Sequence, residues 1–265
     1  MQLETGRIVE QRSGAGVYRR LVVDAPAIAP RVRPGQFVHV RLPAPADALL
    51  RRPFSVFKTG GGRLEILYKP VGRGTEAMRA LAAGDAVSLL GPLGNGFPPC
   101  PADADAVLVA GGYGMAALYL QARDGAARPG TVFAGGKTKD DILCAGDFAA
   151  LGWTVRPATE DGSLGERGLV TDALRRWLAG EGAASRPAFY ACGPNGMLKA
   201  VGEIAIAAGR PAWLSIDRHM GCGVGACLTC VQKIRAPDGG WMWQRVCREG
   251  PVFECRQVVW EDESP

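Results

Sequence analysis

Residues 107–116, VLVAGGYGMA, decide the fold of this chain. The apolar run predicts a buried strand, the glycines predict a tight turn, and Met115 and Ala116 begin a helical segment. Such a turn lets the pyrophosphate of a dinucleotide lie near a helix N-terminus. The spacing is not the G-x-G-x-x-G fingerprint, so a plain turn that needs positive φ remains the alternative explanation for Gly111, Gly112 and Gly114.

The same alternation of strand and helix continues toward the C-terminus. Further apolar runs occupy 131–134, 153–155, 188–192 and 213–216, with helical segments such as 169–179 and 195–208 between them. This pattern predicts a central, doubly wound parallel α/β sheet. Thr171 is a candidate N-cap for the first of these helices, and Gly180 a candidate stop.

Toward the N-terminus the pattern changes to short strands. Apolar runs at 35–42, 63–68 and 86–90 are separated by glycine and proline, which predicts an antiparallel β-barrel. The proline-rich stretch 97–101 is a plausible boundary. We therefore expect an α+β multidomain chain, with the barrel at 1–99, the α/β domain at 100–214 and a small cysteine-rich module at 215–265.

Composition excludes several classes of protein. The 265 residues are 47% hydrophobic and 22% charged, enough for a real core. The net charge of +5 is spread along the chain, which argues against nucleic acid and suits anionic cofactors. With only His39 and His219, a histidine-rich metal site or a histidine-centred hydrolase is not expected. No signal peptide or membrane span is recognisable, so we expect a cytoplasmic protein.

Five of the eight cysteines lie in the last module. Cys222, Cys227 and Cys230 have the spacing C-x4-C-x2-C, and Cys247 follows, as in plant-type [2Fe–2S] sites. Gly221, Gly223 and Gly225 let the backbone wrap closely and direct N–H groups at the sulfurs. The alternative is a four-cysteine zinc site, which usually presents two short cysteine pairs. Cys255 is a spare candidate.

Two further motifs carry groups suited to cofactors. Arg52-Pro53-Phe54-Ser55 offers a cation for a pyrophosphate and a hydroxyl for a flavin edge, although a solvated arginine beside a turn is the plainer interpretation. The turn Gly72-x-Gly74-Thr75 offers backbone donors to phosphate. Cys192-Gly193-Pro194 ends a buried strand, where ligands bind in open α/β sheets, but Cys192 also fits a small core residue.

Taken in order, these motifs resemble those of the ferredoxin reductase superfamily. The segment Gly91-Pro92-Leu93-Gly94-Asn95-Gly96-Phe97 of this chain is part of the same resemblance. Within it, residues 159–165, the cysteine segment and 250–253 are most similar to the electron-transfer subunits of two-subunit, NAD-dependent dihydroorotate dehydrogenases. The family usually shows Gly-Gly-Gly-Ile-Gly at the nicotinamide turn, whereas this chain has Tyr113 there.

The resemblance implies sites for three cofactors. FAD would contact Arg52, Pro53, Phe54, Ser55, Leu67, Tyr68, Lys69, Gly72, Gly74 and Thr75. NAD(H) would face Gly111, Gly112, Gly114, Cys192, Gly193 and Pro194, and the cluster would be held by Cys222, Cys227, Cys230 and Cys247. Ser55 would lie near the reactive edge of the flavin and Cys192 on the nicotinamide side. Lys137 and Lys139 follow the second strand of the α/β domain, so NADP is an alternative to NAD at this site.

The resemblance also implies a partner, because this chain has no room for a substrate barrel of about 250 residues. That partner would be an FMN-containing subunit that oxidises dihydroorotate in pyrimidine biosynthesis, in a heterotetramer. The alternatives are a diaphorase-type NAD(P)H reductase subunit of another redox complex and, outside the enzymes, a zinc-binding nucleotide-sensing module.

Overall fold

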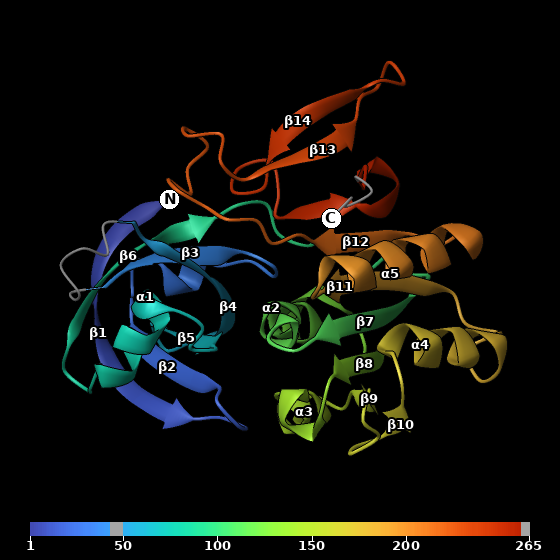
Figure 1. Cartoon of the computed structure of the whole chain (residues 1–265), viewed down its shortest axis with the longest axis horizontal. Coiled ribbons are helices and arrows are strands. Elements are labelled where there is room, and N and C mark those ends of the chain that lie inside the picture. Colours follow the sequence, from blue (N-terminus) through green and yellow to red (C-terminus); the bar gives the residue numbers. More distant parts are fainter. Residues whose placement is uncertain (43–49, 261–265) are drawn as a thin grey trace.

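The computed structural model describes residues 1–42 and 50–260. Figure 1 shows an antiparallel barrel on the left, an α/β sheet with its helices on the right, and the cysteine-rich segment above both. The predicted fold class is confirmed, since both the barrel and the largely parallel sheet are present.

The barrel closes in the order β1-β2-β5-β4-β3-β6. Its strands are β1 (Gln2–Ser13), β2 (Arg19–Asp24), β3 (Phe37–Arg41), β4 (Arg52–Gly60), β5 (Arg63–Tyr68) and β6 (Ala86–Leu93), with short helical turns at η1 (Ala29–Arg31), α1 (Arg73–Ala77) and η2 (Met78–Ala80). Side chains alternate along β6, where Val87 and Leu89 are buried inside the barrel. Closure leaves no unpaired edge strand among the described residues of this half.

The second sheet has the order β10-β9-β8-β7-β11-β12-β15. Its strands are β7 (Asp105–Gly111), β8 (Thr131–Gly136), β9 (Thr154–Thr159), β10 (Glu166–Arg167), β11 (Pro187–Cys192), β12 (Ala212–Ser215) and β15 (Val252–Glu254). All neighbouring pairs are parallel except β12 and β15, which run antiparallel. The cysteine-rich segment therefore contributes the last strand of this sheet.

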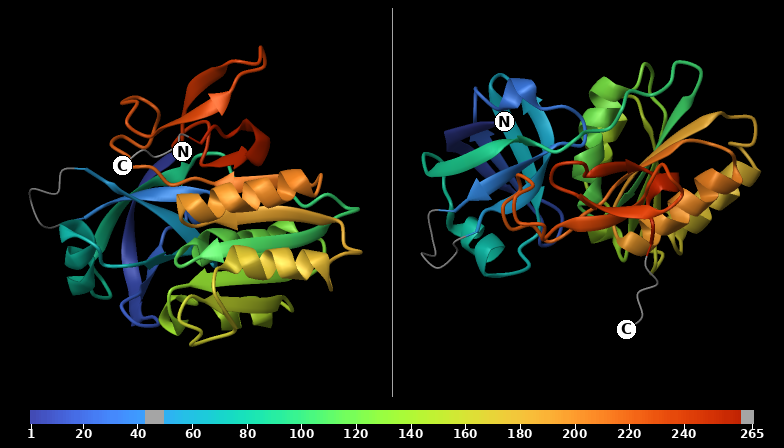
Figure 2. Two further views of the ribbon diagram at one scale, coloured as in Figure 1. Left: turned by 45° about the vertical axis from the view of Figure 1, so that its right-hand side comes forward. Right: turned by 90° about the horizontal axis from the view of Figure 1, so that it is seen from above.

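Helices cover both faces of this sheet, as Figure 2 shows from above. They are α2 (Gly114–Leu120), continued by a π-helical turn η3 (Gln121–Gly125), then η4 (Lys139–Asp141), α3 (Ala145–Ala150), α4 (Val170–Ala179) and α5 (Asn195–Ala207). Helix α2 lies between the sheet and the barrel, whereas α4 and α5 lie on the other face.

The prediction that Thr171 caps a helix is wrong. Helix α4 begins at Val170, so its N-cap is the extended residue Leu169 and Thr171 lies inside the first turn. The Thr171 side chain is buried, so packing rather than capping determines its place. The stop at Gly180 is confirmed, since this residue is the C-cap.

The cysteine-rich segment combines a wrapped loop with a β-hairpin of β13 (Val231–Arg235) and β14 (Trp241–Arg245). After β15 the chain makes one short turn, η5 (Cys255–Gln257). One apolar core fills the barrel and the face under α2, and a second lies under α4 and α5. The second core continues into this segment through Cys230, Ile234 and Val246.

Ion pairs and hydrogen bonds join the barrel to the α/β half. The Tyr18 hydroxyl donates to Asp141 Oδ1 at 2.9 Å, and Arg20 pairs with Asp147 Oδ2 at 2.6 Å. Lys58 of β4 also pairs with Asp147. These contacts join the barrel to η4 and α3 of the α/β half. Among the described residues, no helix is long and apolar enough to cross a membrane.

Candidate functional site

A cleft lies where the barrel meets the carboxyl ends of β11 and β12. It brings together several predicted residues, namely Arg52, Pro53, Phe54, Ser55, Leu67, Tyr68, Lys69, Thr75 and Cys192. It also contains residues that sequence reasoning missed: Phe37, Ala116, Ser215, Ile216, Asp217, Met220 and Pro251. Apolar side chains from the two halves thus face each other, with cations at the barrel side.

The barrel wall of the cleft is built by β4, β5 and the short helix α1. Gly74 lies beneath the Arg52 guanidinium, because a Cβ at Gly74 would be 3.0 Å from Arg52 Nε. The Thr75 hydroxyl accepts the N–H groups of Val71 and Gly72 at 2.9 and 3.2 Å, so it fixes the turn. Gly72 itself is the N-cap of α1 and does not line the cleft.

The glycine turns after β7 and β11 pack directly on each other. A Cβ at Gly114 would lie 2.0 Å from the carbonyl oxygen of Cys192, and one at Gly111 would lie 2.7 Å from Pro194 Cδ. Gly112 has a φ of +53°, so the turn also uses positive φ. Close packing of two backbones therefore explains these glycines whether or not a dinucleotide binds beside them.

We expect Gly114→Ala to destabilise the α/β half by about 2 kcal/mol or more, because the added methyl group overlaps a backbone carbonyl. The midpoint of urea unfolding measures this. Gly146→Ala is the matched control, since Gly146 lies in α3 with no atom within 4 Å of its added Cβ, and helix propensity favours alanine there. Equal midpoints for Gly114→Ala and the wild type would show that the turns are not so closely packed.

Tyr113 and Cys192 form the α/β side of the cleft. The Tyr113 side chain is 51% exposed and lines the cleft, in the turn that departs from the family pattern. Burial raises the pKa of the Cys192 thiol to about 12, against a hydrogen bond with Ser215 that lowers it. A thiol with such a pKa is neutral near pH 7.

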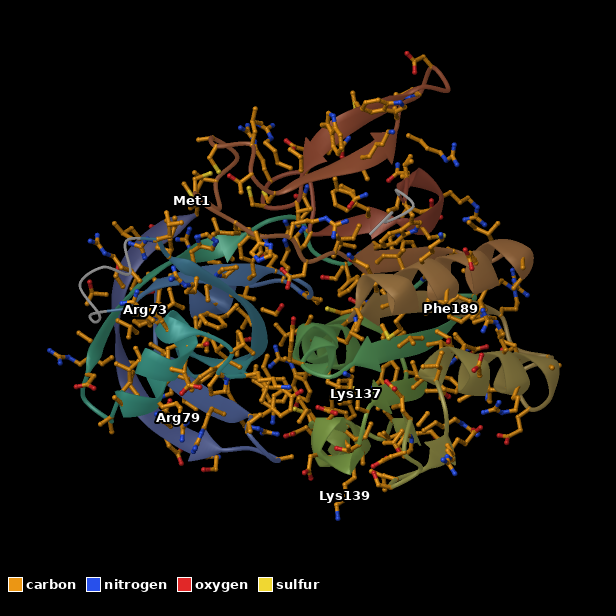
Figure 3. All side chains as sticks on the ribbon, viewed as in Figure 1. Met1, Arg73, Arg79, Lys137, Lys139 and Phe189 are labelled. Carbon is orange, nitrogen blue, oxygen red and sulfur yellow. The ribbon has the colours of Figure 1, made fainter. Side chains whose placement is uncertain are left out.

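Lys137 and Lys139 lie outside the cleft, on the loop between β8 and α3. Both are exposed, and Figure 3 shows the Lys139 side chain pointing away from the rest of the chain. The Asp141 carboxylate accepts the N–H groups of Lys137 and Thr138, which orders this loop.

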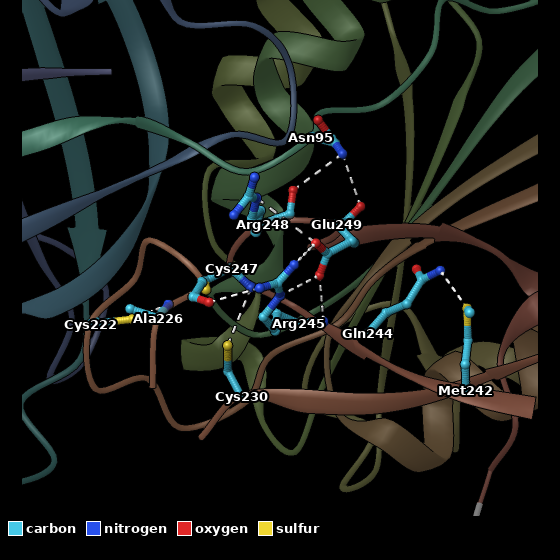
Figure 4. A network of polar contacts seen from close by, with 11 residues as sticks. Asn95, Cys222, Ala226, Cys230, Met242, Gln244, Arg245, Cys247, Arg248 and Glu249 are labelled. Carbon is cyan, nitrogen blue, oxygen red and sulfur yellow. Dashed lines mark hydrogen bonds and ion pairs between the residues drawn. The ribbon is translucent and has the colours of Figure 1, made fainter. Parts of the chain in front are cut away.

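The loop 222–227 directs backbone N–H groups at sulfur, and Figure 4 draws one of these residues, Ala226, beside Cys222. Cys222 Sγ accepts from Ala226 at 3.2 Å and from Val224 and Cys227 at 3.4 Å each. Cys227 Sγ accepts from the Thr229 hydroxyl at 3.2 Å and from the Cys222 N–H at 3.4 Å. These donors, with Thr229 first, lower the pKa of Cys227 to about 6, so a thiolate is favoured there.

The four cysteines lie as two pairs. Cys227 interacts with Cys222, and the N–H of Cys247 donates to Cys230 Sγ at 3.4 Å. Burial raises the pKa of Cys247 to about 12. Within residues 1–42 and 50–260, no three His, Cys, Asp or Glu side chains converge as ligands of one ion. Cys255 is buried at the start of η5, against Gly202 of α5.

The segment 91–97 fixes the cysteine-rich segment to the barrel (Figure 4). Asn95 Nδ2 donates to the carbonyl oxygens of Glu249 and Arg248 at 3.0 and 3.3 Å. A Cβ at Gly94, whose φ is +73°, would lie 2.5 Å from Pro251 Cδ. Arg245 pairs with Glu249 and donates to the carbonyl oxygen of Gly225 at 2.8 Å. The cysteine loop is thus held to the barrel by a continuous set of contacts.

The barrel, the parallel sheet and the cleft between them define an oxidoreductase of the ferredoxin reductase type. A solved NADH-dependent reduced ferredoxin-NADP oxidoreductase superposes with a TM-score of 0.84, at 28% identity, over 97% of this chain and 90% of that one. A ferredoxin NADP+ reductase from Neisseria gonorrhoeae, solved with FAD and NADP, shares the fold with a TM-score of 0.65 at 15% identity, over 79% of this chain and 92% of that one.

Sequence relatives define the family more narrowly. Residues 217–259 match the family model described as the iron-sulfur cluster binding domain of dihydroorotate dehydrogenase B. The dihydroorotate dehydrogenase B (NAD(+)) electron transfer subunit of Desulforamulus reducens is 42% identical over 243 residues, 90% of this chain and 91% of that protein. The one from Geobacillus thermodenitrificans is 40% identical over 258 residues, 95% and 96% of the two chains. This chain belongs to the family of dihydroorotate dehydrogenase B electron transfer subunits.

Proposed function

We propose that this chain passes electrons between NAD(H) and a catalytic subunit that oxidises dihydroorotate. FAD would lie in the cleft, and a [2Fe–2S] cluster at the four cysteines. One observation carries the proposal: Met220 lines the cleft, and Cys222 follows it by two residues. The flavin site and the cluster site are therefore neighbours along one short stretch of backbone.

The chemistry of the two ends explains why a flavin is needed. A nicotinamide transfers a hydride and a [2Fe–2S] centre exchanges single electrons, and a bound flavin can do both. The residues of this chain then have to hold and separate these groups, and none of them has to act as an acid or base. The proposed domains are 1–99 for FAD, 100–214 for NAD(H) and 215–265 for the cluster.

The barrel side of the cleft fits FAD. Arg52 and Lys69 supply cations for the pyrophosphate, and Leu67 with the ring of Tyr68 supplies an apolar wall. The Tyr68 hydroxyl donates to Gln11 at 2.7 Å, which keeps the ring in place. Ser55 is the hydroxyl on the same strand as Arg52, and it would hydrogen-bond the flavin edge. The remaining proposed FAD contacts are Pro53, Phe54, Gly72, Gly74 and Thr75.

On the opposite wall, Cys192 and the two glycine turns fit NAD(H). The proposed contacts are Gly111, Gly112, Gly114, Cys192, Gly193 and Pro194, at the carboxyl ends of β7 and β11, where an open α/β sheet binds its ligand. Tyr113 lines the same opening. The nicotinamide would therefore enter between this wall and the flavin, with the Cys192 thiol beside it.

We expect Cys192→Ala to slow flavin reduction by NADH by about tenfold or less, with the same pH dependence as the wild type between pH 7 and 9. The reason is that the thiol, with a pKa of about 12, stays protonated over that range and contributes only contacts. Stopped-flow bleaching of the flavin at several pH values measures this. A step near pH 8–9 in the wild type that disappears in the variant would instead assign a thiolate to the reaction.

The cysteine loop fits a [2Fe–2S] cluster held by Cys222, Cys227, Cys230 and Cys247. The two pairs of thiols suit two irons that each take two cysteines, and the backbone N–H groups stabilise thiolate charge. Thiolates have to replace the thiols when the cluster binds, and the hydrogen bonds to Cys227 already favour that.

An apolar face beside the cluster loop is consistent with a binding surface for a partner subunit. It consists of Leu228, Trp241, Met242 and Trp243, whose side chains are each at least 45% exposed. Leu228 lies between Cys227 and Cys230, so this face adjoins the cluster site. Exposed aromatic and methionine side chains are typical of protein interfaces. The partner would be the FMN-containing catalytic subunit, assembled with this chain as a cytoplasmic heterotetramer.

The solved structure with a TM-score of 0.84 favours a second candidate, a reductase subunit of another redox complex. That chain is only 28% identical, whereas the dihydroorotate dehydrogenase B relatives reach 42% over nearly the whole length. We therefore place the orotate assignment first, and the partner assay at the end of the Discussion separates the two.

The cofactors are tested by an anaerobic absorbance spectrum of the purified chain, with iron, sulfide and flavin analysis, before and after NADH is added. We expect FAD, two irons and two sulfides per chain, and bleaching of the flavin by NADH. A colourless protein that contains zinc would support the nucleotide-sensing alternative and refute the redox function.

A further inference from the structure

Within residues 1–42 and 50–260, His39 is the one fully buried side chain whose polar atoms face the cluster loop without a partner. It lies on β3 of the barrel and is 0% exposed. Both ring nitrogens, Nδ1 and Nε2, lack a hydrogen-bond partner among the described residues. Burying such a group is costly unless it is hydrogen-bonded, so a partner should exist in the working protein.

The imidazole is in direct contact with the loop that carries Cys222. A Cβ at Gly223 would lie 2.4 Å from His39 Cε1 and 2.7 Å from each ring nitrogen. Gly223 also has a φ of +70°, so both sterics and backbone conformation require glycine there. The loop is therefore pressed against the ring, one residue from a proposed iron ligand.

The surrounding side chains do not satisfy the ring. Arg51, the residue before β4, donates to the carbonyl oxygens of Ser88 and His39 at 2.8 and 3.5 Å, and not to the imidazole. Phe37, two residues earlier on β3, packs its ring 5.8 Å from His39 and lines the flavin cleft. His39 thus lies between the cleft and the cluster loop.

We propose that His39 donates a hydrogen bond from its ring to a sulfur of the [2Fe–2S] cluster and so tunes the potential of the cluster. Burial lowers the pKa of His39 to about 4, so the ring is neutral and has one N–H to donate. The loop supplies the other donors through its backbone, and hydrogen bonds to sulfur raise the reduction potential of such clusters. This inference rests on the proposed function, because it requires the cluster.

The test combines a spectroscopic signal from histidine nitrogen with the reduction potential of the cluster. The untagged chain is labelled with 15N-histidine, the cluster is reduced chemically, and pulsed electron paramagnetic resonance detects nitrogen coupled to the electron spin. Because the chain has only two histidines, a signal that is absent in His39→Phe and present in His219→Gln identifies His39. His219 is exposed, which makes it the matched control.

A redox titration of the same variants supplies the second measurement. We expect His39→Phe to shift the reduction equilibrium of the cluster about tenfold toward the oxidised form, about 59 mV for one electron, and His39→Gln to restore part of it through its amide N–H. The inference is overturned if His39→Phe leaves the cluster potential unchanged or shifts only the flavin potential. It is also overturned if the wild type shows no coupling between a histidine nitrogen and the cluster. A chain without iron and sulfide overturns the proposed function as well, whereas a normal cluster without the coupling overturns this inference alone.

Discussion

Cys227→Ala should abolish electron delivery to the partner subunit while NADH still reduces the flavin. We expect at least a 100-fold loss of delivery, because even the groups that support metal ligands cost about 10–100-fold when removed. Cys227 is an exposed residue, so its replacement leaves the apolar core unchanged. The broad visible absorption of the cluster should disappear from the spectrum, and the flavin bands should remain.

Cys255→Ala is the matched control for that experiment. Cys255 is also in the cysteine-rich segment, but its thiol donates to Glu254 Oε1 at 3.4 Å and its Cβ packs beside Gly202 of α5. We expect a normal cluster spectrum and normal delivery in this variant. A variant at Cys227 that still delivers electrons at the wild-type rate would mean that the cluster is not on the route.

The second large effect is expected at the apolar face beside the cluster. Trp243→Asp should weaken binding of the catalytic subunit by about 30-fold to 1000-fold, which corresponds to about 2–4 kcal/mol for a central aromatic residue of an interface. Trp243 is 52% exposed on β14 and contacts Trp241 edge to face, with ring centroids 5.6 Å apart. A carboxylate there cannot be buried without cost.

Titration of the purified catalytic subunit in an analytical ultracentrifuge measures this affinity. Ile206→Asp is the control, because Ile206 is 49% exposed on α5, away from the cluster loop. The control should bind as the wild type does, and both variants should keep their cofactor spectra. Equal affinities for Trp243→Asp and the wild type would place the interface elsewhere.

Much of the architecture could be predicted because it depends on local pattern. Alternating apolar residues predicted the barrel, and the strand–glycine–helix unit at 107–116 predicted the parallel sheet, since these periods follow from backbone geometry. The antiparallel pairing of β15 with β12 was not predicted, because the three residues of β15 acquire their partner only through a tertiary contact. The failure at Thr171 has the same origin: burial overrode its preference for a cap.

The residues of the candidate site also divide into those that the sequence reveals and those that only the fold brings together. Cysteine spacing and the Arg52–Ser55 run are visible in sequence because the chemistry depends on residue type. Phe37 and Met220 were missed because the fold alone brings them to the cleft. His39 lies two residues after Phe37 on β3, so it depends on the same tertiary contacts and had no signal of its own in the sequence. Asp217 had an available signal, because it follows the carboxyl end of a strand, where an open α/β sheet binds its ligand.

The most direct test of the account uses the complex of this chain with the catalytic subunit encoded by the same genome, for which we propose an FMN cofactor. Purified anaerobically, the complex should reduce NAD+ when dihydroorotate is added, and the catalytic subunit alone should not. The complex with Cys227→Ala should oxidise dihydroorotate with an artificial acceptor but form no NADH. A wild-type complex with both flavins and the cluster in place that forms no NADH from dihydroorotate would contradict the account.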